Sequence, residues 1–221
     1  MGRTPQVGAG WNEWAWAWLE DCVRNDDVRA GHPEVLLDVL AERFSAGRFD
    51  PHQVIAESAV DILLEAAGRA PSAGNSQPWS FIVGRRGDTI HTRMCRHLAR
   101  SSSVWAPEAG LLLVNLAHVF VEGTDMEFSE FAEYDLGQAV AHLSVQAHGM
   151  GMSVHQFRAF DRDKIAAEFE VPRHWQVTSM AAVGLPHPVD PFHGPSGVRS
   201  TTTRERLPTA AITWARDHHG A

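Results

Sequence analysis

The sequence predicts an α+β sandwich in which helices surround a central sheet, and three observations lead to this prediction. Residues 128–148 carry apolar side chains at helical spacing and precede glycines that end a helix. Residues 111–114 form a continuous apolar run, as expected of a strand buried on both faces. Further strand-like runs at 153–157 and 177–183 alternate with helical stretches, and this mixture is typical of layered helices and sheet.

Two helices are expected before the first strand. Pro33 suits the first turn of a helix, whose apolar stripe continues to about Gly47. A second helix is expected to begin near Ser58, because Ser58 with Asp61 fits a helix start. The residues expected to form its buried face are Ala59, Ile62, Leu63 and Ala66.

A strand at 81–84, a turn at 84–88 and a short helix through Ile90, Met94 and Leu98 are expected next. The residues expected to face inward from the long helix at 128–148 are Phe131, Leu136, Ala139, Val140 and Leu143. Four prolines favour an extended arm over residues 186–198, of a kind that could cross a partner subunit.

Residues 1–32 are predicted to be a Trp-rich N-terminal extension, and residues 33–221 a single domain. Trp11, Trp14 and Trp18 share one face at helical spacing, so we expect a helix packed on the domain or on a partner subunit. A poorly ordered extension is the alternative, and the segment carries no catalytic motif.

Composition excludes several kinds of partner. The chain has 221 residues, of which 44% are hydrophobic and 21% charged, as in a soluble globular protein. Its net charge of −8 argues against nucleic acid or an anionic membrane, although a local arginine cluster can still bind an anionic cofactor. Cys22 and Cys95 form no spaced motif, and no membrane span or secretory signal is expected, so we predict a cytoplasmic protein with reduced thiols.

The common motifs for metal and nucleotide binding do not occur in the chain. Thirteen histidines invite a metal hypothesis, but His142 and His148 lie six positions apart on different faces of a helix, and no spaced ligand motif is present. We therefore expect no metal site. Gly8, Ala9 and Gly10 lack the third glycine and the preceding strand of a dinucleotide-binding fingerprint.

Residues 71–79 are the strongest functional signal. They join a helical stretch to a strand, and Gly74 with two prolines prevents a helix there. The small side chains of Ser72, Ala73 and Gly74 allow a flat ligand to approach the backbone, and Asn75 offers hydrogen-bonding groups for the edge of a heteroaromatic ring. An ordinary polar loop is the alternative.

Five blocks resemble, in the same order, segments of the FMN-dependent nitroreductase family. The most specific covers residues 70–83, and the resemblance as a whole covers roughly residues 36–215. The other blocks are residues 43–50, residues 134–139, residues 160–161 with 171–172, and residues 204–208. The resemblance implies a three-layer sandwich, a central and mostly antiparallel sheet flanked by helices, in a homodimer whose sites lie between the subunits.

The resemblance also assigns the cofactor's phosphate. Arg43, Arg204 and Arg206 would converge on the FMN phosphate together with Ser45, in a segment that also includes Phe44. Arginine suits this task because its planar fork donates two parallel hydrogen bonds. In the alternative, these arginines are solvated surface charges.

For the flavin ring, the resemblance assigns one segment from each subunit. Pro71, Ser72, Ala73 and Asn75 of the partner would lie at the ring, and the backbone at Arg158–Ala159, through the Ala159 N–H, would donate to flavin N5. Three positions depart from the family pattern. They are Gly47, where an arginine is usual and Arg48 follows one place later; Arg158, where glutamate or glycine is usual; and Ser102, where a ring-contacting asparagine is frequent.

The function implied is an FMN-dependent oxidoreductase in which NADH or NADPH reduces the flavin and a nitroaromatic, a quinone or a related small molecule reoxidises it. The nicotinamide donor would dock transiently, since the chain has no Rossmann motif. Three alternatives stay open: a flavin-dependent dehydrogenase, an enzyme that breaks down the flavin itself, and a flavin-binding protein with weak turnover.

Overall fold

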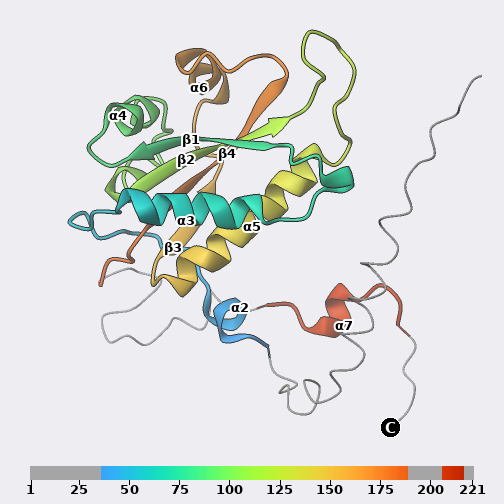
Figure 1. The fold of residues 1–221 in the computed structure, drawn as a ribbon. Coiled ribbons are helices and arrows are strands. Elements are labelled where there is room, and N and C mark those ends of the chain that lie inside the picture. Colours follow the sequence, from blue (N-terminus) through green and yellow to red (C-terminus); the bar gives the residue numbers. More distant parts are fainter. Residues whose placement is uncertain (1–35, 189–205, 217–221) are drawn as a thin grey trace, which may run out of the picture. The chain divides into compact units, whose positions relative to one another are not determined.

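The computed structural model describes residues 36–188 and 206–216 (Figure 1). Asp38–Ala221 form one compact unit, and Leu36 and Leu37 are the described part of the other, Met1–Leu37. The Trp-rich extension, its boundary at residue 32 and most of the proline-rich arm lie outside the described residues, so these expectations remain predictions.

A four-stranded antiparallel sheet with the order β1-β2-β4-β3 forms the centre of the domain. Its strands are β1 (Trp79–Arg85), β2 (Leu111–His118), β3 (Ser153–Phe157) and β4 (Trp175–Gly184). All four predicted strands are confirmed, and three are longer than predicted. The residues beyond the predicted bounds belong to the strands because they pair with a neighbouring strand, as Trp79 pairs with Ala117. The apolar pattern of a single strand does not reveal such pairing.

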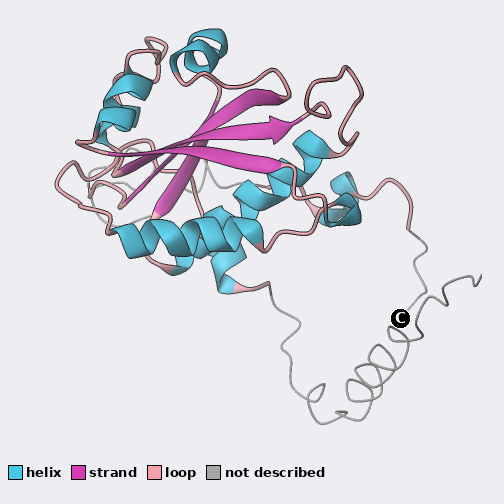
Figure 2. Cartoon of the chain, turned by 45° about the horizontal axis from the view of Figure 1, so that its top comes forward, coloured by secondary structure: helices cyan, strands magenta, loops and turns pink. Residues whose placement is uncertain are grey.

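Helices cover both faces of the sheet, which confirms the predicted three-layer sandwich (Figures 1 and 2). Helices α3 (Glu57–Gly68) and α5 (Ala132–Gly149) pack on one face. Helices α4 (Thr89–Cys95) and α6 (Arg162–Glu168) pack on the other, through Met94 and Ile165. The shorter elements are α2 (Asp38–Glu42), η2 (Ala73–Asn75), η3 (Ala106–Glu108) and α7 (Thr209–Ile212).

Several predicted helix boundaries and faces were wrong. Helix α5 begins at Ala132, not at residue 128, so Phe131 precedes the helix and is 45% exposed. Helix α3 buries Val60, Leu63 and Ala67, which lie on one stripe, whereas Ile62 points away and is 45% exposed.

Two further helices end earlier than predicted, and in each case the residues that follow contact a segment distant in sequence. Helix α4 ends at Cys95, and Leu98 instead forms a β-bridge with Phe160. In the described residues, α2 ends at Glu42, before Gly47, and the backbone beyond it bonds to β3. Tertiary hydrogen bonds thus override the local helical pattern.

Gly84→Ala is expected to destabilise the domain by about 1–3 kcal/mol, because no space exists for a side chain where β1 passes α4. A Cβ at residue 84 would lie 2.6 Å from the His91 backbone nitrogen and 2.8 Å from its Cα. Urea unfolding measures the effect, with Gly68→Ala as the control. Gly68 ends α3, and a Cβ added there would meet nothing within 4 Å, so that change should be neutral or stabilising. Equal stability of the two variants would contradict this packing.

Candidate functional site

The segment that carries Arg43 is fastened to the start of β3 by a buried serine. Ser153 Oγ donates to the Phe44 carbonyl oxygen at 2.7 Å and accepts from the Ala46 N–H at 2.9 Å. Ser153 is 1% exposed, so both hydrogen bonds are shielded from water. Arg43 and Ser45, the predicted phosphate residues on either side of Phe44, are therefore set beside β3. Among the described residues, none forms an ion pair with Arg43.

The same segment continues along β3 through His155. Its Nδ1–H donates to the Ala46 carbonyl oxygen at 2.7 Å, and its ring stacks on Trp105 with centroids 4.4 Å apart. Arg48 lies 3.8 Å from a carboxylate oxygen of Glu108, so the arginine beside Gly47 has an acidic neighbour in the chain. Residues 43–48 and the turn before η3 are thus both packed against β3.

Ala159 follows the end of β3, and its carbonyl oxygen is held by two donors. The Ala99 N–H donates to it at 2.9 Å, and the Ser102 hydroxyl also donates to it. No described residue accepts a hydrogen bond from the Ala159 N–H. Ser102, expected at the ring, is fully buried, while Arg158 is exposed. A backbone donor without an acceptor in the described chain is what the N5 assignment requires.

The turn formed by residues 71–77 is fastened instead to helix α5. Gly74, Asn75 and Gln77 have φ of 59°, 55° and 48°, a left-handed backbone that only glycine adopts without strain. The Ala73 N–H donates to Asp135 Oδ2 at 2.9 Å, and Asp135 is 2% exposed in the first turn of α5. Asp135 Oδ1 also accepts from the Gln138 side chain at 3.2 Å. The buried carboxylate therefore fixes the turn that is predicted to bind the ring.

Within one chain, the two predicted halves of the ring site lie at opposite edges of the sheet. The 71–77 turn precedes the edge strand β1, and Ala159 follows the other edge strand, β3. Strands are spaced by about 4.8 Å, so three intervals separate the edges by roughly 14 Å. The turn also belongs to the α5 layer, whereas Ala159 adjoins Phe160 in the opposite layer. Within one chain, the width of the sheet therefore separates the two segments.

The other predicted phosphate residues are not brought to this place by the described structure. Arg204 lies outside the described residues. Arg206 is exposed and precedes α7. Their convergence with Arg43 remains a prediction.

Two of the positioning residues were missed as such by sequence reasoning. Asp135 lies in a block that resembles the family, but nothing in the sequence pairs it with Ala73, 62 positions away. Ser153 begins a strand that also contains His155 and Gln156, so its polar side chain alone does not indicate a specific partner.

A third missed residue, His118, lies next to the turn. Its backbone N–H donates to the Pro78 carbonyl oxygen at 3.0 Å, and its ring lies between Phe128 and Trp175, at centroid distances of 3.8 and 4.6 Å. Burial and then the neighbouring His174 lower the pKa of His118. The imidazole is therefore mainly neutral at pH 7, and its ring stacks on Phe128 and Trp175 at the end of β2.

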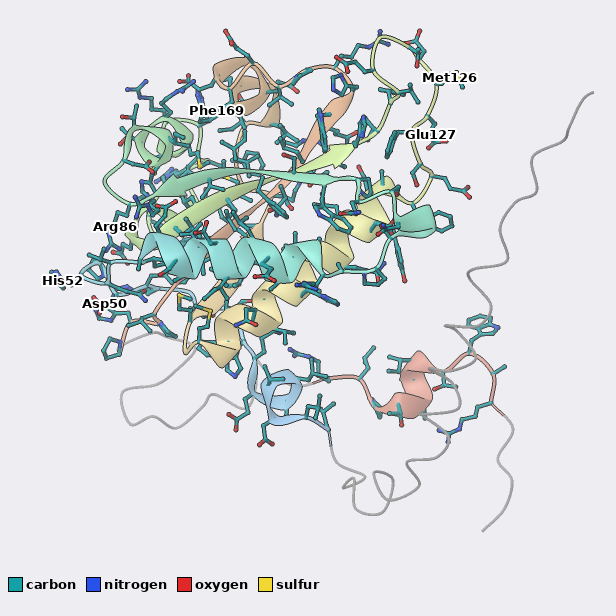
Figure 3. The ribbon with its side chains drawn as sticks, in the orientation of Figure 1. Asp50, His52, Arg86, Met126, Glu127 and Phe169 are labelled. Atoms are coloured by element: carbon teal, nitrogen blue, oxygen red, sulfur yellow. The ribbon has the colours of Figure 1, made fainter. Side chains whose placement is uncertain are left out.

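A hollow of about 580 Å³ lies at a different end of the sheet, where Figure 3 shows Asp50, His52 and Arg86 together. The Arg86 guanidinium donates to the carbonyl oxygens of Glu108 at 2.6 Å, of Asp50 at 3.3 Å and of Gln53. Arg86 therefore stabilises the loop after residue 48 and is already occupied by backbone acceptors. Met126 and Glu127 lie on a loop at the opposite end (Figure 3).

Other reactive groups do not form a second centre in the described part of the chain. Burial raises the pKa of the Cys95 thiol to about 11, so it carries no thiolate at neutral pH. Residues 36–188 and 206–216 contain no group of three or more metal-ligating side chains. No helix in these ranges is both long and apolar enough to cross a bilayer.

The profile of the Nitroreductase family matches residues 40–185, which include both segments of the candidate site. The chain belongs to the nitroreductase family. The suspected resemblance is thereby confirmed, and so are its antiparallel sheet and helical layers.

Two proteins of related sequence align with this chain over most of their own length. An uncharacterized 15.4 kDa protein of Mycolicibacterium smegmatis is 34% identical over 137 residues, 58% of this chain and 88% of that protein. The 5,6-dimethylbenzimidazole synthase of Rhodospirillum rubrum is 32% identical over 171 residues, 64% of this chain and 78% of the synthase.

Among solved structures, an oxidoreductase containing FMN superposes with a TM-score of 0.72 at 23% identity. The match covers 86% of this chain and 96% of that structure. At this identity the likeness establishes the nitroreductase fold, and it carries no residue assignments by itself.

Proposed function

We propose that this protein is an FMN-dependent oxidoreductase that works as a homodimer, with NADH or NADPH as reductant and a nitroaromatic, quinone or related molecule as oxidant. The observation that carries the proposal is the Ala159 N–H, which has no acceptor among the described residues and follows β3, the strand that also holds the Arg43 segment. Family membership and the FMN-containing structural neighbour support the same cofactor.

The described residues suit the different parts of FMN. Arg43, which has no ion-pair partner among them, offers a cation for the phosphate, and the Ala159 N–H offers a donor for ring nitrogen N5. The turn at residues 72–74 offers a backbone that a flat ring can approach. FMN held by these residues would supply N5 as the hydride acceptor, and reductant and oxidant would then use one site in turn. A donor already directed at N5 would draw electron density from that atom and so make it a better hydride acceptor, without reorganisation during the transfer.

Two measurements on the purified protein test the proposal: its absorption spectrum, and the rate at which NADH or NADPH reduces its bound flavin. We expect flavin absorption bands, and rapid anaerobic bleaching of those bands on stopped-flow mixing with NADH or NADPH. A flavin-loaded protein that bleaches only slowly would support the weak-turnover alternative, which the departures at Gly47, Arg158 and Ser102 motivate. A protein that takes up no flavin would contradict both.

A stable homodimer is expected, because Ala159 and the 71–77 turn lie at opposite edges of one chain. Shared sites of this kind need a large interface, so the dimer should persist at micromolar concentration. Sedimentation of the flavin-loaded protein measures the mass. A flavin-loaded monomer would refute the two-chain site.

A second candidate is an enzyme that breaks down the flavin, and the similarity to 5,6-dimethylbenzimidazole synthase favours it. The dimethyl-substituted benzene ring of that product is also part of the flavin. Aerobic incubation with reduced FMN distinguishes the candidates. Formation of dimethylbenzimidazole would favour the second, whereas reoxidation of the flavin without loss of the ring favours the first.

A further inference from the structure

The Ser102 hydroxyl is committed to the backbone and is unavailable to a ligand. A serine hydroxyl has one hydrogen to donate. Here it is directed to the carbonyl oxygens of Ala99, at 3.1 Å, and of Ala159. Ser102 has no exposed surface. These contacts favour a role for Ser102 other than direct contact with the flavin ring.

Backbone hydrogen bonds hold the turn around Ser102. The Ala99 carbonyl oxygen accepts from the Ser102 N–H at 3.1 Å and from the Ser103 N–H at 2.9 Å. The Ser102 carbonyl oxygen in turn accepts from the Ala106 N–H at 2.9 Å. Beyond the turn, Trp105 meets the edge of Phe157 at a centroid distance of 5.0 Å. These contacts hold the turn in place, so the Ser102 hydroxyl has a defined position beside the residues that follow β3.

The backbone around Ala159 leaves one donor unused. The Phe160 N–H donates to the Arg158 carbonyl oxygen, and the Asp161 N–H donates to the His97 carbonyl oxygen, both at 2.9 Å. Of these three successive amides, only that of Ala159 has no acceptor among the described residues. The Arg158 carbonyl oxygen, which shares a peptide plane with the Ala159 N–H, accepts from Phe160, and the Ala159 carbonyl oxygen accepts from Ala99 and Ser102. Both peptide planes that adjoin Ala159 are therefore held.

We propose that Ser102 is a positioning residue that holds Ala159, through its carbonyl oxygen, with the Ala159 N–H directed at flavin N5. This inference rests on the proposed FMN-dependent function. Ser102 thus acts on the reactivity of the flavin through the backbone, and contributes little to flavin affinity.

The test compares Ser102→Ala and the hydroxyl-retaining Ser102→Thr with Ser103→Ala. Ser103 is a matched control, because its exposed hydroxyl donates at 3.2 Å to the Arg100 carbonyl oxygen in the same turn and does not reach Ala159. Three quantities are measured: amide hydrogen exchange of residues 158–161 without flavin, FMN affinity, and the midpoint potential of bound FMN.

For Ser102→Ala we expect exchange of residues 158–161 to become up to about tenfold faster, as for one lost hydrogen bond. We also expect a lower midpoint potential, since a loosened donor draws less electron density from N5 and leaves the ring a weaker electron acceptor. The FMN Kd should stay within about threefold of wild type, because Ser102 itself does not contact the ring. Ser103→Ala should match wild type, and Ser102→Thr should restore the potential at least in part.

Two results would overturn the inference while leaving the proposed function intact. The first is a Ser102→Ala protein with wild-type exchange and potential. The second is a Ser102→Ala protein that loses FMN affinity at unchanged potential, which would make Ser102 a ring contact. Wild-type protein that binds no flavin would instead refute the proposed function and the role of Ser102 together.

Discussion

Replacing Arg43, Arg204 or Arg206 by alanine is expected to weaken FMN binding roughly ten- to hundredfold and to leave riboflavin binding nearly unchanged. Each change removes a charge-assisted hydrogen bond to phosphate, worth about 1.5–3 kcal/mol. Riboflavin lacks the phosphate, so its affinity should not depend on this hydrogen bond. The described structure gives Arg43 no ion-pair partner and sets its segment beside β3 through Ser153. Titration of each variant with both flavins measures the effect.

The control for this prediction is Arg69→Ala. Arg69 is an exposed arginine that pairs with Glu65 one helical turn earlier, at 2.8 Å, and no assignment places it at the cofactor. Its replacement should change neither affinity. Equal losses of FMN and riboflavin in the arginine variants would mean that the arginines act on stability rather than on the phosphate.

Replacing Asp135 by alanine is expected to weaken FMN and riboflavin equally, by roughly five- to hundredfold. The change leaves the Ala73 N–H without its acceptor, at a cost of about 1–3 kcal/mol. The turn with left-handed Gly74 and Asn75 then loses its attachment to α5. Because this turn is assigned to the ring, which both flavins share, the loss should not depend on phosphate. Calorimetric titration with each flavin measures it.

Glu133→Ala is the matched control for Asp135. Glu133 lies in the same first turn of α5 and carries the same charge near the helix dipole, but it accepts from Gln176 instead, at 2.7 Å. Wild-type affinities are expected for this variant, and Asp135→Asn, which keeps an acceptor oxygen, should recover part of the loss. A Glu133→Ala protein as impaired as Asp135→Ala would show that helix charge, not the contact with Ala73, is responsible.

The sequence predicted the strands better than the helices. Strand β3 was placed at its observed bounds, Ser153–Phe157, directly after the glycines that were expected to end the long helix. The start of α5 was placed four residues early, because Phe131 is apolar but its exposure depends on neighbours distant in sequence. Similarly, Leu98 fits a helical stripe but pairs with Phe160, which no local pattern can indicate.

For the candidate site, the family resemblance identified segments but not their internal contacts. It placed Ala159 after a strand, and the structure places it there. It could not show that the hydroxyl of Ser102 donates to Ala159, 57 positions away. Residue type at one position defines which hydrogen bonds are available, whereas the partner is decided by the packing of the whole chain.

The central claim is that each flavin site combines the Arg43 segment and Ala159 of one chain with the 71–77 turn of the other. The most direct measurement is FMN binding to a mixed dimer of an Arg43→Ala subunit and an Asp135→Ala subunit. Shared sites place both defects in one site and leave the other intact, so the account predicts one FMN bound per mixed dimer with wild-type affinity. If each site were built within one chain, both sites would be defective, and a mixed dimer that binds no FMN tightly would contradict the account.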